Sequence, residues 1–170
     1  HTRIVVARKH GVPADDKWYN NIFVRRGLEG VKQAPGYASD YNAFVEGAEK
    51  SSFGDEHSIV DSRSGGFSRE DSPLGVSIRI HVNEAVVGLK GPWVDGELIG
   101  ALPTVRQTIE DAFGRPIRVD ADMFGRKRAA PAAGPLASLA PGENALDWSA
   151  KSLARSPDRP NILWITSEDN

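Results

Sequence analysis

Short runs of β-branched and aromatic residues recur along the first fifty positions of the chain. They occupy residues 2–11, 18–24 and 39–47. The first and third end at Gly11 and Gly47, and Gly27 follows the second. Apolar positions at helical spacing are scarce here, and prolines and glycines fill the gaps between the runs. Strands that repeat every 20 to 25 residues or so are typical of the coils of a solenoid. The pattern therefore predicts stacked β-coils over residues 1–74.

Two of these runs carry an asparagine at the same place, directly before an apolar pair. The asparagines are Asn21 in "YNNIF" and Asn42 in "DYNAF". At the corner of a β-solenoid, an asparagine can bond open backbone groups, stack on the same residue of the next coil and tolerate the left-handed conformation. The alternative is that asparagine is simply frequent at turns. The sequence supports the stacked corner and the ordinary turn about equally.

From Gly75 onward the pattern changes to that of an antiparallel sheet. Residues 75–82 alternate strictly between apolar and polar, which is typical of a half-buried strand. A turn at Asn83 predicts a further strand over 85–89, and the Asp95-Gly96 pair predicts a tight hairpin. Residues 104–113 fit a short helix, which we favour, or a strand, and 115–128 predict a closing strand and turn. The expected unit spans residues 75–128.

The remainder of the chain divides into two parts. Residues 129–158 are rich in Ala, Pro, Gly and Ser and predict a tail or linker, with Trp148 as an anchor. Residues 159–170 combine a buried-strand pattern with acids at its carboxyl end. A strand that delivers acids in this way usually begins a domain, so we expect the chain to be a piece of a larger protein.

Composition and charge exclude several classes of function. The 170 residues hold 21 Lys and Arg, 23 Asp and Glu and no Cys, so the formal net charge is −2. This balance gives no electrostatic reason to expect nucleic acid or an acidic membrane as a partner. Without cysteine, disulfides, thiolate metal sites and a cysteine nucleophile are excluded. No apolar run approaches the roughly 18 residues of a membrane helix.

Three stretches carry a resemblance to a known family: "WYNNIFV", "SDYNAFVEG" and the closing "DADMFGRKRAAPAAGPL". Through them the chain resembles the bacterial right-handed parallel β-helix proteins related to pectate and alginate lyases. The resemblance covers residues 1 to about 150 and implies a secreted, periplasmic or cell-surface protein that handles polysaccharides. Lyases of this kind need a base and a cation beside a uronate carboxylate.

The last dozen residues resemble the first core strand of the sulfatase family. In that family an apolar strand after "PN" delivers two acids to a divalent cation, usually Ca²⁺. The resemblance implies Glu168 and Asp169 as metal ligands, with Glu in place of the usual first Asp. The family's "C/S-x-P-S-R" nucleophile motif is absent from these 170 residues. We therefore expect no sulfatase activity from this chain.

Three other groups of residues are candidates for binding. Arg8, Lys9 and His10 form a compact basic cluster at a predicted strand end, suited to an anionic polysaccharide, although a solvated turn explains it better. Trp18, Tyr19 and Tyr37 are able to stack on sugar rings, with burial in the core the expected fate of Trp18. Asp55, Glu56 and His57 offer mixed metal ligands, but neighbours in a strand face opposite sides, so a metal site there would need a loop.

These observations predict a mainly β protein: the end of a right-handed parallel β-helix with a small antiparallel sheet and an extended Ala/Pro/Gly-rich tail. The predicted units are residues 1–74, 75–128, 129–158 and 159–170. The favoured function is binding or processing of an anionic, uronate or sulfated, polysaccharide, with the catalytic part of any enzyme outside this chain. The alternatives are an N-terminal extension of a sulfatase and a purely structural β-solenoid.

Overall fold

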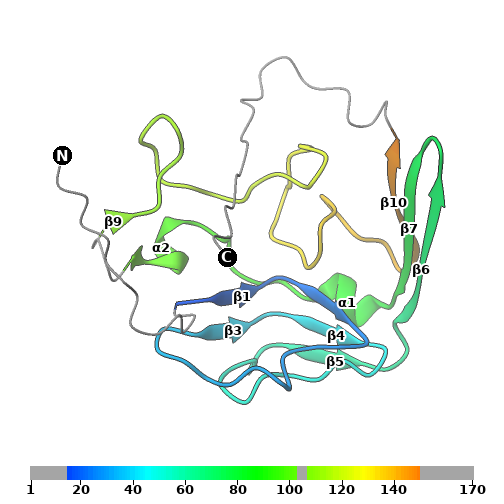
Figure 1. Cartoon of the computed structure of the whole chain (residues 1–170), viewed down its shortest axis with the longest axis horizontal. Helices are drawn as coiled ribbons and strands as arrows, with labels where there is room; N and C mark the ends of the chain where they lie inside the picture. Colours follow the sequence, from blue (N-terminus) through cyan, green and yellow to red (C-terminus); the bar gives the residue numbers. More distant parts are fainter. Residues whose placement is uncertain (1–14, 103–106, 150–170) are drawn as a thin grey trace, which may run out of the picture.

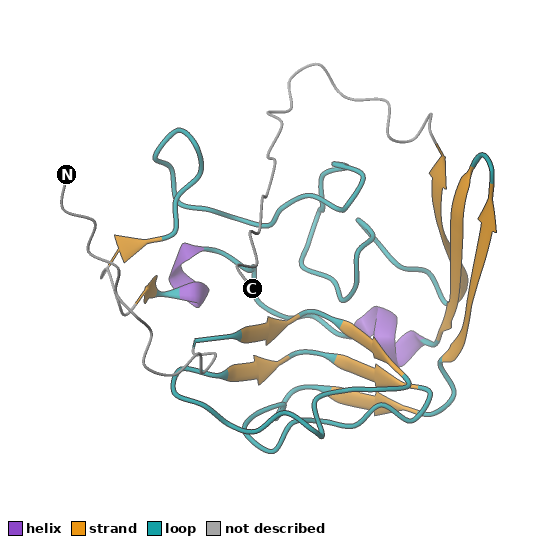
Figure 2. Ribbon diagram, viewed as in Figure 1, coloured by secondary structure: helices purple, strands orange, loops and turns teal. Residues whose placement is uncertain are grey.

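The computed structural model describes residues 15–102 and 107–149 of the chain. Parallel strands stack in successive coils at one side, an antiparallel sheet stands at one end of them, and long loops cover the top (Figures 1 and 2). Most of the described residues that lie outside the coils and the sheet are in loops. The elements in chain order are β1 (Lys17–Tyr19), β2 (Ile22–Val24), β3 (Ala38–Asp40), β4 (Ala43–Val45), β5 (Ile59–Asp61), β6 (Gly65–Ser72), β7 (Gly75–Val82), α1 (Glu84–Gly88), α2 (Gly96–Ile99), β8 (Ala101–Leu102), β9 (Gln107–Thr108) and β10 (Gly142–Ser149).

The stacked coils form two parallel sheets that meet at a corner. β1 pairs with β3 in one sheet, and β2, β4 and β5 pair in that order in the other. The register places Ile22 beside Ala43 and Ala43 beside Ile59. The number of residues from one partner to the next therefore differs between the two coils, and loops of different length between the strands account for the difference. Parallel strands that stack through a continuous coil confirm the predicted β-helix architecture.

The corner asparagines form a stack, which was one of the two alternatives that the sequence left open. Asn42 Oδ1 accepts hydrogen bonds from the backbone N–H of Asn21 at 2.9 Å and from its side-chain amide at 3.1 Å. The next coil continues the series with a serine, because the Asn42 N–H donates to Ser58 Oγ at 2.8 Å. Asn20 and Tyr41, the residues just before the stacked asparagines, have φ values of 58° and 55°, in the left-handed region that such corners require.

Apolar packing continues inside the coils. Phe23 and Phe44 are neighbours in the register and their rings stack with centroids 5.0 Å apart. Phe44, Leu28 and Ala48 are buried together, and Trp18 packs against them, as expected from the sequence. Inside the coils, the aromatic stack of Phe23 and Phe44 therefore continues the side-chain stacking of the corner asparagines Asn21 and Asn42.

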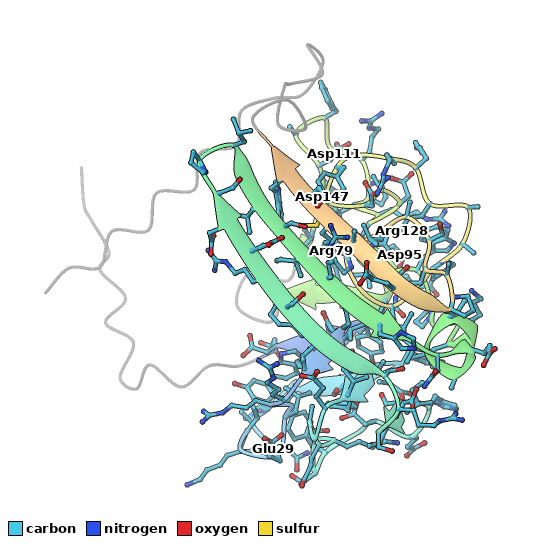
Figure 3. The ribbon with its side chains drawn as sticks, turned by 90° about the vertical axis from the view of Figure 1, so that its right-hand side faces the viewer. Glu29, Arg79, Asp95, Asp111, Arg128 and Asp147 are labelled. Carbon is cyan, nitrogen blue, oxygen red and sulfur yellow. The ribbon has the colours of Figure 1, made fainter. Side chains whose placement is uncertain are left out.

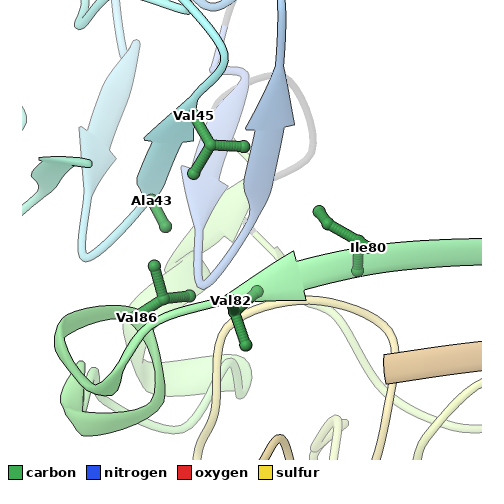
Figure 4. Close-up of a cluster of buried hydrophobic side chains, with 5 residues drawn as sticks. All are labelled: Ala43, Val45, Ile80, Val82 and Val86. Atoms are coloured by element: carbon green, nitrogen blue, oxygen red, sulfur yellow. The ribbon is translucent and has the colours of Figure 1, made fainter. Parts of the chain in front are cut away.

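The outer face of β4 is buried as well, since the antiparallel sheet and α1 cover it. Ala43 and Val45 pack against Ile80 and Val82 of β7 and Val86 of α1. Figure 4 shows the two β4 side chains directed toward those of α1 and β7. This second core fixes the antiparallel sheet to the coils.

The antiparallel sheet has the strand order β10–β7–β6, which differs from the expected arrangement. β7 matches the alternating segment 75–82, but β6 lies within residues 1–74, where stacked coils were predicted, and β10 lies in the predicted tail. β6 is exposed along most of its length, so its sequence has no apolar face to predict it. In β10, Asn144 and Leu146 alternate with exposed residues, and this short signal was missed within the Ala- and Pro-rich context.

Three local predictions over residues 83–113 are wrong. The expected strand at 85–89 lies largely in helix α1, where Val86 and Val87 N–H both donate to Asn83 O. Asp95 does not turn a hairpin: its side chain caps α2 by accepting from Glu97 N and Leu98 N. The favoured helix over 104–113 is not formed in its described part, where β9 pairs with β8.

Candidate functional site

A cleft lies between the first described coil and the loops that cross above it. Two cavities share Tyr19, Asn21 and Val94, and we call them the Arg128 lobe and the Lys17 lobe. The Arg128 lobe, about 270 Å³, is lined by Tyr19, Asn20, Asn21, Trp93, Val94, Val119, Arg128, Pro131, Ala132 and Gly134. The Lys17 lobe, about 330 Å³, is lined by Asp15, Asp16, Lys17, Tyr19, Asn21, Val94, Leu98 and Ile99. Their sizes are at the small end of the range for ligand pockets.

The coil and the loops are tied together at the floor of the cleft. Asn20 donates from its amide to Pro92 O at 2.8 Å, and Gly134 N–H donates to Asn20 O at 2.8 Å. Both contacts depend on glycines. A Cβ on Gly91 would lie 2.0 Å from Asn20 Oδ1, and one on Gly134, whose φ is +78°, would lie 2.8 Å from the Ile22 side chain. The close approach of the loops is therefore encoded by two residues without side chains.

Tyr19 stands at the centre of the cleft because strand alternation points it outward. Its neighbour Trp18 packs into the coil interior, so the Tyr19 side chain lies on the opposite face. Burial, together with the charge of Asp40 beside it in the register, raises the pKa of Tyr19 above its ordinary value. Tyr19 is thus held as a neutral phenol that donates and accepts hydrogen bonds.

Asn21 provides an amide to both lobes. Its Nδ2 donates to Tyr19 O at 3.2 Å and to Asn42 Oδ1 at 3.1 Å. Within residues 15–102 and 107–149, its Oδ1 takes no hydrogen bond. The corner stack therefore leaves an oriented acceptor at the cleft.

Arg128 places a cationic side chain in the wall of the Arg128 lobe. Its guanidinium donates to the backbone oxygens of Ala132 at 2.9 Å and Gly134 at 2.7 Å, which shapes the loop. Burial lowers the pKa of Arg128, and the charge of Asp122 partly offsets this effect. Among the described residues no carboxylate pairs directly with Arg128. Figure 3 labels Arg128 among the loops behind β10.

The two lobes differ in charge. The Arg128 lobe has one cationic side chain and no acidic one in its lining. The Lys17 lobe contains Asp15 and Asp16 together with Lys17. An anionic group is therefore better accommodated in the Arg128 lobe than in the Lys17 lobe.

A second polar group lies at the same corner of the coils, outside the cleft lining. His57 Nδ1 is 2.7 Å from Asp40 Oδ2, and the His57 ring stacks on Tyr41 with centroids 4.8 Å apart. Burial raises the pKa of Asp40, but hydrogen bonds from His57 and Tyr41 outweigh it and hold the pKa below its usual value. A carboxylate that orients an imidazole is an arrangement used by general bases. Here it also stabilises the corner through stacking.

The polar residues 55–57 do not form the metal site considered from the sequence. Asp55 is buried in the coil interior and His57 faces solvent. Both lie in the turn before β5 and not in a strand, so strand alternation does not explain their opposite directions. Among the described residues no cluster of three His, Cys, Asp or Glu side chains is arranged to hold a metal ion. Asp55 instead accepts hydrogen bonds from Ser39 and Ser58, each at 2.7 Å.

Most of the site residues expected from the sequence fall outside the described part of the chain. This applies to Arg8, Lys9 and His10 and to the Ca²⁺ ligands Glu168 and Asp169. Their roles stay predictions. Of the aromatic candidates, Tyr19 lines the cleft, while Tyr37 packs edge-on against Trp18 at 5.1 Å. Trp93 and Arg128 were missed, because loops distant in sequence bring them to the coil.

No protein-family model and no curated protein matches the chain. A solved structure does: XylC in its complex with xylose, with a TM-score of 0.62 and 20% sequence identity. The match covers 79% of this chain and 26% of XylC, so the chain spans about a quarter of that protein's length. XylC contains a parallel β-helix. The chain has a parallel β-helix fold. In the described part no helix is long and apolar enough to cross a membrane.

Proposed function

We propose that this chain binds a polysaccharide in the cleft around Tyr19, with an acidic group of the glycan beside Arg128. The observation that carries the proposal is the lining of the Arg128 lobe, where Tyr19 and Trp93 accompany the amides of Asn20 and Asn21 and one guanidinium. Aromatic rings provide flat apolar surface for sugar faces, and amides fix hydroxyl groups.

The anionic part of the proposal rests on Arg128. Its described hydrogen-bond partners are carbonyl oxygens, which polarise the guanidinium but carry no net charge. A planar guanidinium matches the geometry of a carboxylate or sulfate. The lack of acidic side chains in this lobe supports an acidic sugar at this position.

The similarity to XylC supports a sugar as the class of ligand, since that protein was solved with xylose. Xylan that carries uronic acid groups is therefore a suitable probe, because it combines the sugar of that complex with the charge complementary to Arg128. The same xylan after reduction of its carboxyl groups is a matched neutral control.

The test is isothermal titration of the full chain with both glycans. We expect the acidic xylan to bind at least tenfold more tightly than the reduced form, and this difference to shrink as salt is added. Trp93→Ala should weaken both glycans about tenfold or more, a loss typical of an aromatic contact. Phe113→Ala, which removes an exposed aromatic ring outside the cleft lining, is the control and should leave binding unchanged.

Equal affinity for the two glycans would overturn the role of Arg128 but leave a neutral polysaccharide as ligand. Unchanged binding by the Trp93→Ala variant would overturn the cleft as the binding site. Absence of binding to either glycan would favour a purely structural β-solenoid.

A further inference from the structure

Two five-residue segments in the loops have nearly the same sequence. Residues 111–115 read Asp-Ala-Phe-Gly-Arg and residues 122–126 read Asp-Met-Phe-Gly-Arg. We call them loop 1 and loop 2. Only their second residue differs, so their surroundings can be compared position by position.

The two loops have the same internal hydrogen bonds. In loop 1, Asp111 Oδ1 accepts from the N–H groups of Phe113 at 2.8 Å and Arg115 at 3.0 Å. In loop 2, Asp122 Oδ1 accepts from Phe124 at 2.9 Å and Arg126 at 2.8 Å. Each arginine Nε also returns to its aspartate, at 2.8 Å in loop 1 and 2.7 Å in loop 2.

The tips of the loops match as well. The Arg115 guanidinium lies 5.1 Å from the centre of the Phe113 ring, and Arg126 lies 5.2 Å from that of Phe124. The glycines have φ values of +73° and +78°. Both loops therefore present a phenylalanine on a rigid, preorganised turn.

Loop 2 is covered by other parts of the chain. Met123 N–H donates to Pro135 O at 3.0 Å, and Ala137 N–H donates to Asp122 Oδ2 at 3.2 Å. A bent segment, residues 133–137, thus covers loop 2. Its Pro135 carbonyl and, two residues later, its Ala137 N–H are both hydrogen-bonded to loop 2. The ring of Phe124 lies 5.9 Å from that of Trp148 on β10.

Loop 1 has no such cover within the described residues. Phe113 is 78% exposed, and the Asp111 side chain is 30% exposed where that of Asp122 is fully buried. Ala112 N–H, the counterpart of Met123 N–H, makes no hydrogen bond in the described part of the chain. Asp111 Oδ2 accepts from Arg115 Nε and Nη2, each at 2.8 Å, whereas Asp122 Oδ2 accepts from Arg126 Nε and from Ala137 N–H.

We propose that loop 1 is a docking site for a peptide segment of a partner protein that folds over it as residues 133–137 fold over loop 2. The segment supplies a carbonyl to Ala112 N–H, an N–H two residues later to Asp111, and an aromatic ring to Phe113. Loop 2 with its own cover is the template for each of these contacts. The Pro135–Ala137 segment and Trp148 of a second copy are already engaged by that copy's loop 2, so an identical chain does not supply them without unfolding locally.

The probe is a synthetic peptide with the sequence of residues 134–148, which contains the template segment and Trp148. It is titrated into the isotope-labelled full chain, and amide chemical shifts are followed by NMR. We expect saturable shifts at Ala112 and Phe113 with peptide at up to about 1 mM, the weak end of specific recognition. Phe113→Ala should weaken the binding at least fivefold without a change in fold, because the ring is exposed. A peptide with Ala in place of its Trp148 should bind the unmodified chain as weakly as the original peptide binds the Phe113→Ala variant.

Three outcomes would overturn the proposal. The first is the absence of shifts at Ala112 up to this concentration. The second is chemical-shift changes confined to loop 2, which would mean that the peptide replaces the chain's own Pro135–Ala137 segment there. The third is unchanged affinity in the Phe113→Ala variant.

Discussion

The coil stack and the loops above it are stabilised in different ways. In the stack, side chains meet their counterparts in the next coil, as Phe23 meets Phe44 and Asn21 meets Asn42. In the loops, single carboxylates such as Asp122 organise the backbone locally through several N–H groups. The first kind of structure depends on the register between coils, whereas the second depends on one residue at a time. We therefore expect mutations to act globally in the stack and locally in the loops.

The largest effect is expected in the stack. Phe44 is completely buried and stacks on Phe23, so Phe44→Ala removes both its packing and the aromatic contact. We expect a loss of about 3–5 kcal/mol in the free energy of unfolding. Urea unfolding followed by circular dichroism measures it. Val60→Ala on β5 is the control, because Val60 is 60% exposed; a similar loss in both variants would contradict a core built on the coil interior.

A smaller effect is expected from the buried carboxylate of the same stack. Burial opposes ionisation of Asp55, but hydrogen bonds from Ser58, Ser39 and Ser51 outweigh it and hold the pKa of Asp55 below its ordinary value. Asp55→Asn keeps the size of the side chain but replaces an acceptor with a donor, so we expect a loss of about 2 kcal/mol at neutral pH.

This loss should depend on pH. Because the pKa of Asp55 is lowered in the folded state, its contribution to stability is complete above the ordinary value of 3.8 and is lost as the pH falls from there through the lowered pKa. The difference between wild type and Asp55→Asn should therefore narrow between pH 7 and about pH 3. Urea unfolding of both proteins at the two pH values measures the change. Asp71→Asn on exposed β6 is the matched control and should unfold like wild type.

The regularity of the stack also explains why it was the more predictable region. The recurring strand runs and the alternation in residues 75–82 predicted the stacked coils and β7. The sequence interpretation still treated residues 18–24 as one strand, whereas the corner at Asn20 and Asn21 divides it into β1 and β2. The two asparagines mark this corner, but the aromatic and β-branched residues on both sides resemble one continuous strand.

The loops and the cleft were less predictable because their contacts join residues far apart in sequence. Tyr19 was a candidate from the sequence, but Trp93 and Arg128 reach the same cleft only through loops that follow the coils. The aspartates that organise these loops have no period, and only the repeated Asp-x-Phe-Gly-Arg segment marks two of them. Loop positions of this kind are predicted by comparing local motifs with each other and not by periodicity.

The smallest effects are expected from that repeated motif, and they distinguish its two copies. Asp122→Ala removes a buried carboxylate that also holds Ala137 N–H, so we expect a loss of about 1 kcal/mol in the free energy of unfolding. Asp111→Ala removes the same internal bonds from an exposed loop, so its loss in the free energy of unfolding should be clearly smaller. We expect its main effect to be faster amide hydrogen exchange at residues 112–115. Urea unfolding and amide exchange of both variants measure the difference. Equal losses would mean that the motif stabilises each loop by its internal bonds alone, and that the cover over loop 2 adds nothing.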